Sequence, residues 1–487
     1  MACVLSVAAL AACSGGNGGG NATPVPSKPD QTKEEEKTKP AESQDKTEKP
    51  TEEQTTETPV DLGGLEVIIG DWWTNPDAKP ETKAAQATAD FREEMMKKYN
   101  YKVVQKAIAS WGEFNDGLFA NDVNNNNLQA SVYVLDSAFV TGPMNNDLFY
   151  DLSTLKNIDL DDEKWNQSTI SLMTRGDHVY GLSIGATEPR LGVFFNKRIL
   201  KKYGIGEEEL YDLQKAGKWT WAEYERICKA CTQDDDGDGV MDTYGTASFS
   251  ADFFSAVTTG AGVDWVYKDE TGHYVNNITS PEWTAAMNWG VDMLSKYEMP
   301  DPTEGATWNW FIAAFKDGKV AMTVAEEYKV GDWKDMEDDW GFVMFPYADK
   351  KTLPTSKLDH CVQLVRENVL VLPKSFTAEE AENVAFVLDK YANPTPGYEA
   401  DDDWTASYYN AFRDDRAVDE TLTEMRKFEN QVLNYRPLVS VDGLTDGDIN
   451  FNVYTSYGNT PASTPAAKAE EIKDVWDSVL EDLNKKF

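Results

Sequence analysis

Leu65-Glu-Val-Ile-Ile-Gly-Asp-Trp-Trp-Thr-Asn-Pro76 is the stretch from which the fold can be worked out. Its first half, Leu65–Gly70, is a β-branched apolar run with the length of a buried strand. The second half, Asp71–Pro76, carries residues that end strands and form turns. A helix is expected at about 81–99, because apolar side chains such as Phe91 recur there at helical spacing.

The following hundred residues repeat this alternation of strand and helix. A second strand begins at Val103, a helix is expected over Phe114–Val123, and Ser131–Asp136 is a third strand. Short connections between such elements predict an α/β fold with a parallel, doubly wound sheet. Ligands of these sheets lie beyond the carboxyl ends of the strands. The candidate ligand-binding residues at these strand ends are Trp72, Trp73 and Asp136.

Five segments in the second part of the chain carry a family resemblance. Gly192–Gly204 (GVFFNKRILKKYG) resembles the asparagine-lysine segment of family 1 extracellular solute-binding proteins of ABC sugar importers. The segments that follow are similar to those of the family and stand in the same order. They are Lys218–Tyr224 (KWTWAEY), Phe315–Met322 (FKDGKVAM), Trp340–Pro346 (WGFVMFP) and Asn368–Ser375 (NVLVLPKS). The ordered set covers roughly residues 65–487.

The resemblance implies a two-lobed, periplasmic-binding-protein-like fold of type II, with the ligand cleft between the lobes. Lobe one would comprise residues 61–186 plus 367–400, and lobe two residues 187–366 plus 401–487. Two such lobes close on a ligand by a hinge motion that changes little inside either lobe. The hinge candidates are 183–187 and 365–368.

The N-terminus has the features of an export signal. Residues 1–13 contain an apolar run of signal-peptide length, and Leu10-Ala-Ala-Cys13 resembles the lipobox of bacterial lipoproteins, in which Cys13 is lipidated. The usual basic residues before the run are missing, so a disordered apolar terminus with a chance cysteine is the alternative. Residues 14–60 are rich in Gly, Lys, Glu, Thr and Pro, which predicts a disordered tether. We therefore expect a protein anchored by lipid to the extracellular face of the cytoplasmic membrane, in a bacterium without an outer membrane.

Composition narrows the class of partner. The chain has 84 acidic and 46 basic residues, and its net charge of −38 argues against nucleic-acid binding. Cys228 and Cys231 form a CxxC inside an expected helix, without the strand-to-helix context of a redox motif. We interpret both as small buried hydrophobic residues.

A second chemical motif is the acidic loop DDDGDGVMD at residues 234–242. Carboxylates at its first, third, fifth and ninth positions, a glycine at the sixth and a backbone carbonyl at the seventh match the start of an EF-hand-like calcium loop. The predicted metal ligands are Asp234, Asp236, Asp238, Val240 (by its carbonyl) and Asp242. The twelfth position, usually Glu, is Gly245 here. A structural Ca²⁺ is the prediction, and a solvated acidic turn without metal is the alternative.

Aromatic residues suggest the chemistry of the ligand. The chain has 15 tryptophans, and indole faces stack on the C–H faces of sugars while charged and amide groups bind the hydroxyls. Trp308 is a further candidate because it lies in an irregular segment. By the resemblance, Glu188 and Arg190 at the crossover, Glu327 and Tyr328 after the FKDGKVAM segment, and Trp404 would also line the cleft.

These features favour a monomeric substrate-binding protein that captures a carbohydrate, with an oligosaccharide favoured, and delivers it to the permease subunits of an ABC transporter. No catalytic motif is recognisable, so we do not expect an enzyme. One alternative is a surface carbohydrate-active enzyme. Another is a binding protein for a peptide or a polyamine, because the many acidic residues would suit a cation.

Overall fold

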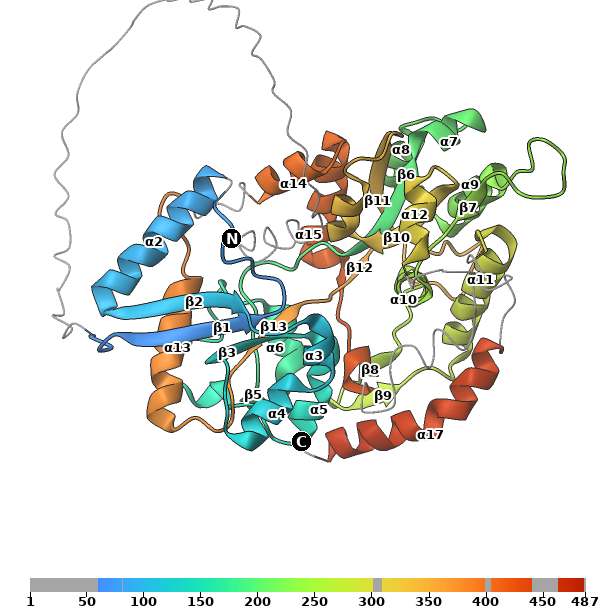
Figure 1. Cartoon of the computed structure of the whole chain (residues 1–487). Helices are drawn as coiled ribbons and strands as arrows, with labels where there is room; N and C mark the ends of the chain where they lie inside the picture. The colour runs from blue at the N-terminus through green and yellow to red at the C-terminus, as the bar shows by residue number, and fades with distance from the viewer. Residues whose placement is uncertain (1–59, 81, 301–308, 399–403, 440–462, 486–487) are drawn as a thin grey trace, which may run out of the picture.

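The computed structural model describes residues 60–80, 82–300, 309–398, 404–439 and 463–485. The predicted signal peptide with Cys13, the predicted tether up to residue 59, and Trp308 lie outside these ranges. The described chain forms two α/β lobes, each built around a four-stranded sheet (Figure 1). The expected two-lobed fold is confirmed.

The first lobe contains a sheet of strand order β13-β3-β1-β2. Strand β1 pairs in parallel with both β2 and β3, as the alternation of strands and helices predicts. Helix α2 begins after Thr82, whose side chain accepts a hydrogen bond from the Ala85 amide, and α13 begins with a capping box of Thr377 and Glu380. The elements are β1 (Leu65–Asp71), α2 (Lys83–Tyr99), β2 (Tyr101–Ala107), β3 (Val132–Asp136), β13 (Asn368–Val371) and α13 (Ala378–Ala392).

The second lobe contains a sheet of strand order β11-β6-β10-β7. All residues of β6, β10 and β11 are buried, because helices and long loops cover both faces. Cys228 and Cys231 are free thiols, both fully buried in α9, which confirms that they act as small hydrophobic residues. The elements are β6 (Leu191–Asn196), α9 (Trp221–Cys231), β7 (Tyr244–Thr246), α10 (Ser250–Gly260), α11 (Pro281–Tyr297), β10 (Val320–Glu326), β11 (Trp340–Met344) and α17 (Pro465–Asn484).

Neither sheet is purely parallel, which corrects the sequence prediction. Strand β13 runs antiparallel to β3, and β6 runs antiparallel to β10 and β11. The reason is that each of these strands begins where its neighbour ends: Asn368 opens β13 opposite Asp136, and Leu191 opens β6 opposite Glu326. Because the chain enters each lobe at the junction, β6 and β13 run away from the junction. The strands that pair with them run toward the junction, so the pairing is antiparallel.

The helix expected over Phe114–Val123 is two helices, α3 and α4. Gly117 separates them with a φ of 91°, a left-handed conformation that other residues rarely adopt. Smaller elements complete the two lobes. They are α3 (Trp111–Asn115), α4 (Leu118–Asn125), η2 (Ser137–Phe139), α5 (Thr141–Asn145), α6 (Gln167–Met173), β4 (Thr174–Arg175), β5 (His178–Val179), α7 (Lys197–Lys202), α8 (Glu209–Lys215), β8 (Val266–Lys268), β9 (Tyr274–Asn276), α12 (Trp310–Lys316), β12 (Gln363–Leu364), α14 (Thr405–Ala411), α15 (Thr423–Arg426), β14 (Gln431–Val432) and η8 (Arg436–Val439).

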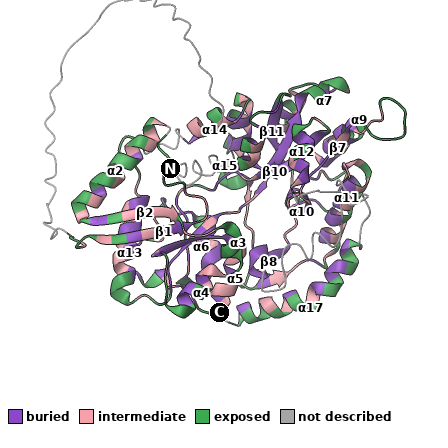
Figure 2. Ribbon diagram, viewed as in Figure 1, coloured by how far each residue is buried: buried purple, intermediate pink, exposed green. Residues whose placement is uncertain are grey.

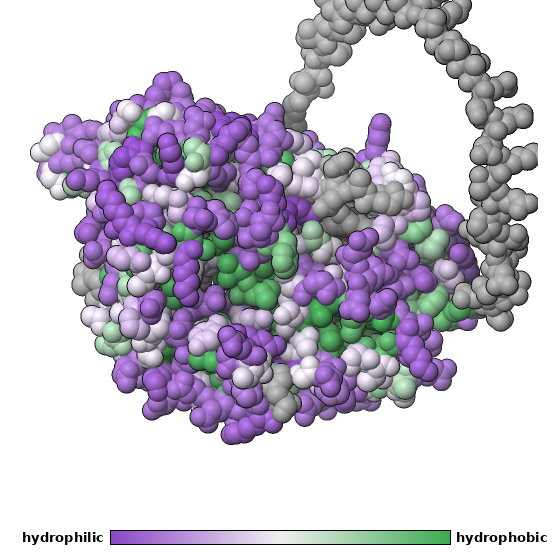
Figure 3. Space-filling model, turned by 180° about the vertical axis from the view of Figure 1, so that it is seen from behind, coloured by the Kyte–Doolittle hydropathy of each residue, from purple (hydrophilic) through white to green (hydrophobic). Residues whose placement is uncertain are grey.

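Burial follows the layers of the fold. Figure 2 shows the central strands of the second lobe buried and the outer faces of α2, α13 and α17 exposed. Seen from behind, the surface is mostly hydrophilic, and apolar side chains gather in the middle of the face and over its lower part on the side of the first lobe (Figure 3). Among the described residues no helix is long and apolar enough to cross a membrane.

Candidate functional site

Two chain segments cross between the lobes side by side, and hydrogen bonds join them. The Glu188 amide donates to Glu367 Oε1 over 2.9 Å, and the Arg190 amide donates to Gln363 Oε1 over 3.1 Å. The Arg190 side chain also reaches across, because its Nε donates to the Arg366 carbonyl over 2.9 Å. The two crossing segments are therefore hydrogen-bonded to each other and are not independent linkers.

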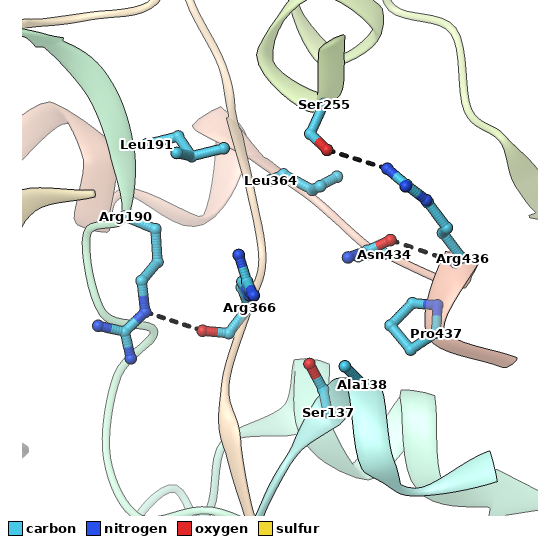
Figure 4. A pocket seen from close by; sticks show the side chains of 10 residues that line it. All are labelled: Ser137, Ala138, Arg190, Leu191, Ser255, Leu364, Arg366, Asn434, Arg436 and Pro437. Carbon is cyan, nitrogen blue, oxygen red and sulfur yellow. Dashed lines mark hydrogen bonds between the residues drawn. The ribbon is translucent and has the colours of Figure 1, made fainter. Parts of the chain in front are cut away.

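A pocket lies beside these crossing segments (Figure 4). Its wall on the first lobe is the start of η2, and its wall on the second lobe includes Ser255 of α10 and Leu191 of β6. The segment around η8 closes a third side. The residues that line the pocket are Ser137, Ala138, Arg190, Leu191, Ser255, Leu364, Arg366, Asn434, Arg436 and Pro437. Because both lobes and the crossing segments contribute, the shape of the pocket depends on how the lobes are placed.

Arginine is the main polar residue of this pocket, and acidic residues hold two of its three guanidinium groups. Arg190 Nη1 donates to Glu327 Oε1 over 3.0 Å. Arg366 forms ion pairs with Glu326 at 3.2 Å and with Asp252 at 3.7 Å. The third arginine, Arg436, donates from Nη1 to Ser255 Oγ over 3.0 Å. Guanidinium groups supply donors in a fixed plane, which suits hydroxyl and carboxylate oxygens of a ligand.

The carboxyl groups behind the arginines differ in their affinity for protons. Burial raises the pKa of Glu327 to about 8, although the charge of Arg190 opposes this. Burial likewise raises the pKa of Glu367 to about 7. Although burial pushes the other way, the charges of Arg366 and Arg190 hold the pKa of Glu326 below its usual value. The pKa values of the hinge carboxyl groups are thus shifted in opposite directions by burial and by the neighbouring arginines.

The predicted pair Trp72 and Trp73 follows β1 in a turn that Asp71 organises. Asp71 is fully buried, and its Oδ1 accepts hydrogen bonds from the amides of Trp73 (3.0 Å) and Thr74 (2.8 Å). Gln105 Nε2 of β2 donates to Asp71 Oδ2 over 2.8 Å. The two indoles meet edge to face, and they pack against the two different core clusters of the molecule. Both residues lie in the turn after β1, so the alternation of a strand does not separate their side chains, whose ring centroids are 4.6 Å apart.

Aromatic rings continue along this edge of the first lobe. Trp72 contacts Phe114 with ring centroids 5.4 Å apart, and Trp111 contacts Phe139 at 5.0 Å. Trp111 is 46% exposed, and Phe139 follows the pocket residues of η2 directly. Trp111 is therefore linked through Phe139 to the segment that lines the pocket, and an accessible indole is a group on which a sugar ring can stack.

The other predicted ligand residues fall into different places. Glu188 and Arg190 lie in the first crossing segment, and Glu188 Oε2 accepts a hydrogen bond from the Tyr408 hydroxyl over 3.0 Å. Asp136, at the end of β3, caps η2 through a hydrogen bond from the Ala138 amide. Tyr328 follows β10 and is 43% exposed.

Trp404 does not lie at the pocket surface. It is 8% exposed and packs against Tyr408, with Arg426 over its ring at 4.4 Å. Sequence reasoning missed Arg366 and Arg436, which line the pocket. For Arg366 the sequence offered one signal, its position within the expected hinge 365–368. For Arg436 it offered none, because only the fold brings this residue to the pocket.

The acidic loop gathers three of its four predicted carboxylates. Oxygen atoms of Asp234, Asp236 and Asp242 lie within 4.8 Å of one another. Asp238 is not part of this group, and its Oδ1 accepts a hydrogen bond from the Val240 amide over 2.8 Å. Gly237 and Gly239 have φ values of 77° and 92°, which allows the loop to turn sharply.

A two-lobed α/β molecule with a polar pocket at its hinge defines the class of ligand-binding proteins that close around a solute. The model of the bacterial extracellular solute-binding protein family matches residues 86–408, which is more than half of the chain. The protein belongs to this family. A search of curated protein sequences found no match.

Solved structures share the fold at low sequence identity. A cyclic α-maltosyl-1,6-maltose binding protein of Arthrobacter globiformis has a TM-score of 0.59 at 15% identity, and the match covers 86% of this chain and 100% of that one. An ABC substrate-binding protein of Listeria monocytogenes in complex with cycloalternan has a TM-score of 0.55 at 15% identity, with coverage of 86% and 99%. The maltose-maltodextrin binding protein of Alicyclobacillus acidocaldarius has a TM-score of 0.53 at 15% identity, with coverage of 85% and 100%.

The protonated carboxyl of Glu367 predicts how stability depends on pH. Its pKa is about 7 in the folded chain and 4.5 in the unfolded chain, so the unfolded state loses the proton first as the pH rises. The contribution of this group to stability is complete below pH 4.5 and is lost as the pH rises toward 7. Glu367→Gln keeps the acceptor for the Glu188 amide and does not titrate. We expect this variant to lose less stability than the wild type between pH 5 and pH 8, by up to about 3 kcal/mol.

Urea unfolding at several pH values measures this difference. Glu380→Gln is the control, because Glu380 is an exposed helix cap whose pKa is lowered, so it stays ionised throughout this range. Equal pH slopes for the wild type and Glu367→Gln would contradict the assignment.

Proposed function

We propose that this protein captures a carbohydrate, with an oligosaccharide favoured, by closing its lobes and delivers it to the permease subunits of an ABC importer. The observation that carries the proposal is the inter-lobe pocket, which arginines of the hinge line; the exposed Trp111 packs against Phe139, the residue after Ala138 of the pocket wall. Charged planar groups bind hydroxyls, and indole faces cover the apolar faces of sugar rings. The sugar-binding proteins with the same fold support this class of ligand.

We also propose that the protein acts as a monomer and performs no chemistry on its ligand. A surface carbohydrate-active enzyme would need an acid and a base flanking a glycosidic bond. The carboxylates near the pocket instead hold arginines: Glu327 pairs with Arg190, and Glu326 pairs with Arg366. For a peptide or polyamine ligand, the three arginines in the pocket wall are unfavourable to a cation.

Calorimetry of the purified protein against a panel of oligosaccharides tests the function. We expect stoichiometric binding of at least one sugar without turnover, and Trp111→Ala should weaken it about tenfold through loss of stacking. Val475→Ala is the matched control, because Val475 is similarly exposed (45%) on α17. Release of shorter sugars would favour the enzyme, whereas binding of peptides or polyamines in place of sugars would overturn the ligand class.

We also propose that the loop 234–242 binds a structural Ca²⁺. The grouped carboxylates of Asp234, Asp236 and Asp242 are oxygen ligands of the kind that this hard cation prefers. The Asp238 carboxylate and the Val240 carbonyl are the other predicted ligands. The ion would hold together a loop in which like charges otherwise repel one another.

Thermal unfolding with Ca²⁺ and with EDTA tests the calcium site. We expect EDTA to lower the melting temperature of the wild type, and Asp236→Asn to reduce this difference. Asp269→Asn is the control, because Asp269 likewise accepts hydrogen bonds from backbone amides in an exposed turn. An unchanged melting temperature in EDTA would leave the loop as a solvated acidic turn.

Finally, we propose that Cys13 carries the lipid anchor of the protein on the outer face of the cytoplasmic membrane. The sequence motif at Leu10–Cys13 and the extracellular family support this location. In cells, Cys13→Ser should move the protein from the membrane fraction to the soluble fraction. Cys361→Ser should leave it with the membrane. Equal fractionation of Cys13→Ser and wild type would contradict the anchor.

A further inference from the structure

Arg366 occupies a special position in the hinge. It lies in the second crossing segment, between β12 and β13, and 35% of its side chain is exposed toward the pocket. Three carboxylates surround its guanidinium group: Glu326 Oε1 at 3.2 Å, Asp252 Oδ1 at 3.7 Å and Asp136 Oδ2 at 4.0 Å.

These carboxylates come from both lobes. Asp136 is the last residue of β3 in the first lobe. Asp252 lies in the first turn of α10, and Glu326 ends β10, both in the second lobe. The guanidinium group of Arg366, on the second crossing segment, therefore forms ion pairs with carboxylates of both lobes.

Arg366 is the cation that forms ion pairs with all three carboxylates. The carboxylate side chains are only 9% to 18% exposed, so their mutual repulsion is screened less than it would be in open water. Other charged or titratable groups at the cluster are Arg190, Lys329 and Tyr328. Arg190 donates a hydrogen bond to Glu327, and Lys329 lies 3.9 Å from Asp332, so both cations also have other partners. Without Arg366, three carboxylates would face one another across the junction of the lobes.

We propose that Arg366 is a positioning residue that holds the two lobes together in the ligand-free protein by neutralising carboxylates of both. Loss of its charge leaves mutual repulsion between Asp136 on one side and Asp252 and Glu326 on the other, and the lobes move apart. The proposal concerns the protein before it binds anything, so it does not depend on the identity of the ligand.

The test measures the distance between the lobes without ligand. Spin labels are placed at Lys97→Cys on α2 and Lys201→Cys on α7, which are exposed residues of the first and second lobes, with Cys361→Ser in every variant. Arg366→Gln removes the charge and keeps a polar side chain. At low ionic strength we expect a longer and broader distance distribution than in the parent protein, and added salt should shorten it because salt screens the repulsion.

Second variants separate electrostatics from simple loss of a contact. Arg366→Gln with Glu326→Gln should return toward the parent distance, and Arg366→Lys should stay close to it. Arg198→Gln is the control, because Arg198 pairs with Asp338 within the second lobe. If Arg366→Gln does not fold, as judged by circular dichroism, Arg366→Gln with Asp136→Asn should fold and keep the parent distance, because it also removes the carboxylate of the first lobe; a double variant that does not fold, or that folds with a lengthened distance, would contradict the electrostatic role.

The outcomes are distinct from those of the sugar-binding test. An unchanged distance in Arg366→Gln, or an equal change in Arg198→Gln, would overturn the role of Arg366 even if a sugar binds. Absence of sugar binding would overturn the proposed ligand and leave the inter-lobe distances as they are. Once a ligand is identified, Arg366→Gln can also be tested by binding. If only about a tenth of the variant molecules can close, the apparent Kd should rise about tenfold.

Discussion

The pairing of the two crossing segments is the constraint on which the rest of the structure depends. Glu188 and Arg190 donate backbone hydrogen bonds to Glu367 and Gln363, and the Arg190 side chain binds the Arg366 carbonyl. These contacts join residues more than 170 positions apart in the chain. Because each segment opens a strand of the lobe that it enters, the pairing also fixes β6 and β13 against their neighbours.

The same junction brings arginines and carboxylates together beside the pocket. Arginines face the pocket, and carboxylates behind them keep their guanidinium groups in place. Such pairs cost desolvation energy and are weak evidence for stability. Here they place donors of fixed orientation at a point that both lobes reach. A ligand bound in this pocket would contact both lobes at once, because both contribute to its walls.

The aromatic edge of the first lobe complements this charged region. Asp71 binds the backbone of the turn after β1 and so fixes Trp72 and Trp73, while Trp111 stays exposed beside η2. Trp111 packs against Phe139, which directly follows the pocket residues Ser137 and Ala138. The hinge arginines line the pocket itself, and the proposed sugar ligand rests on these two features together.

The sequence by itself determined the two-lobed α/β class. The apolar runs of the strands and the ordered segments that resemble the family can both be read directly from the order of residues. It also predicted α2, the buried CxxC and the place of Glu188 and Arg190 at the crossover. Only the tertiary structure decided the antiparallel direction of β6 and β13, the burial of Trp404, and the gathering of Asp136, Asp252 and Glu326 around Arg366. The physical reason is that periodicity reports which face of an element is apolar, whereas partners far apart in the chain meet only when the crossing segments pair.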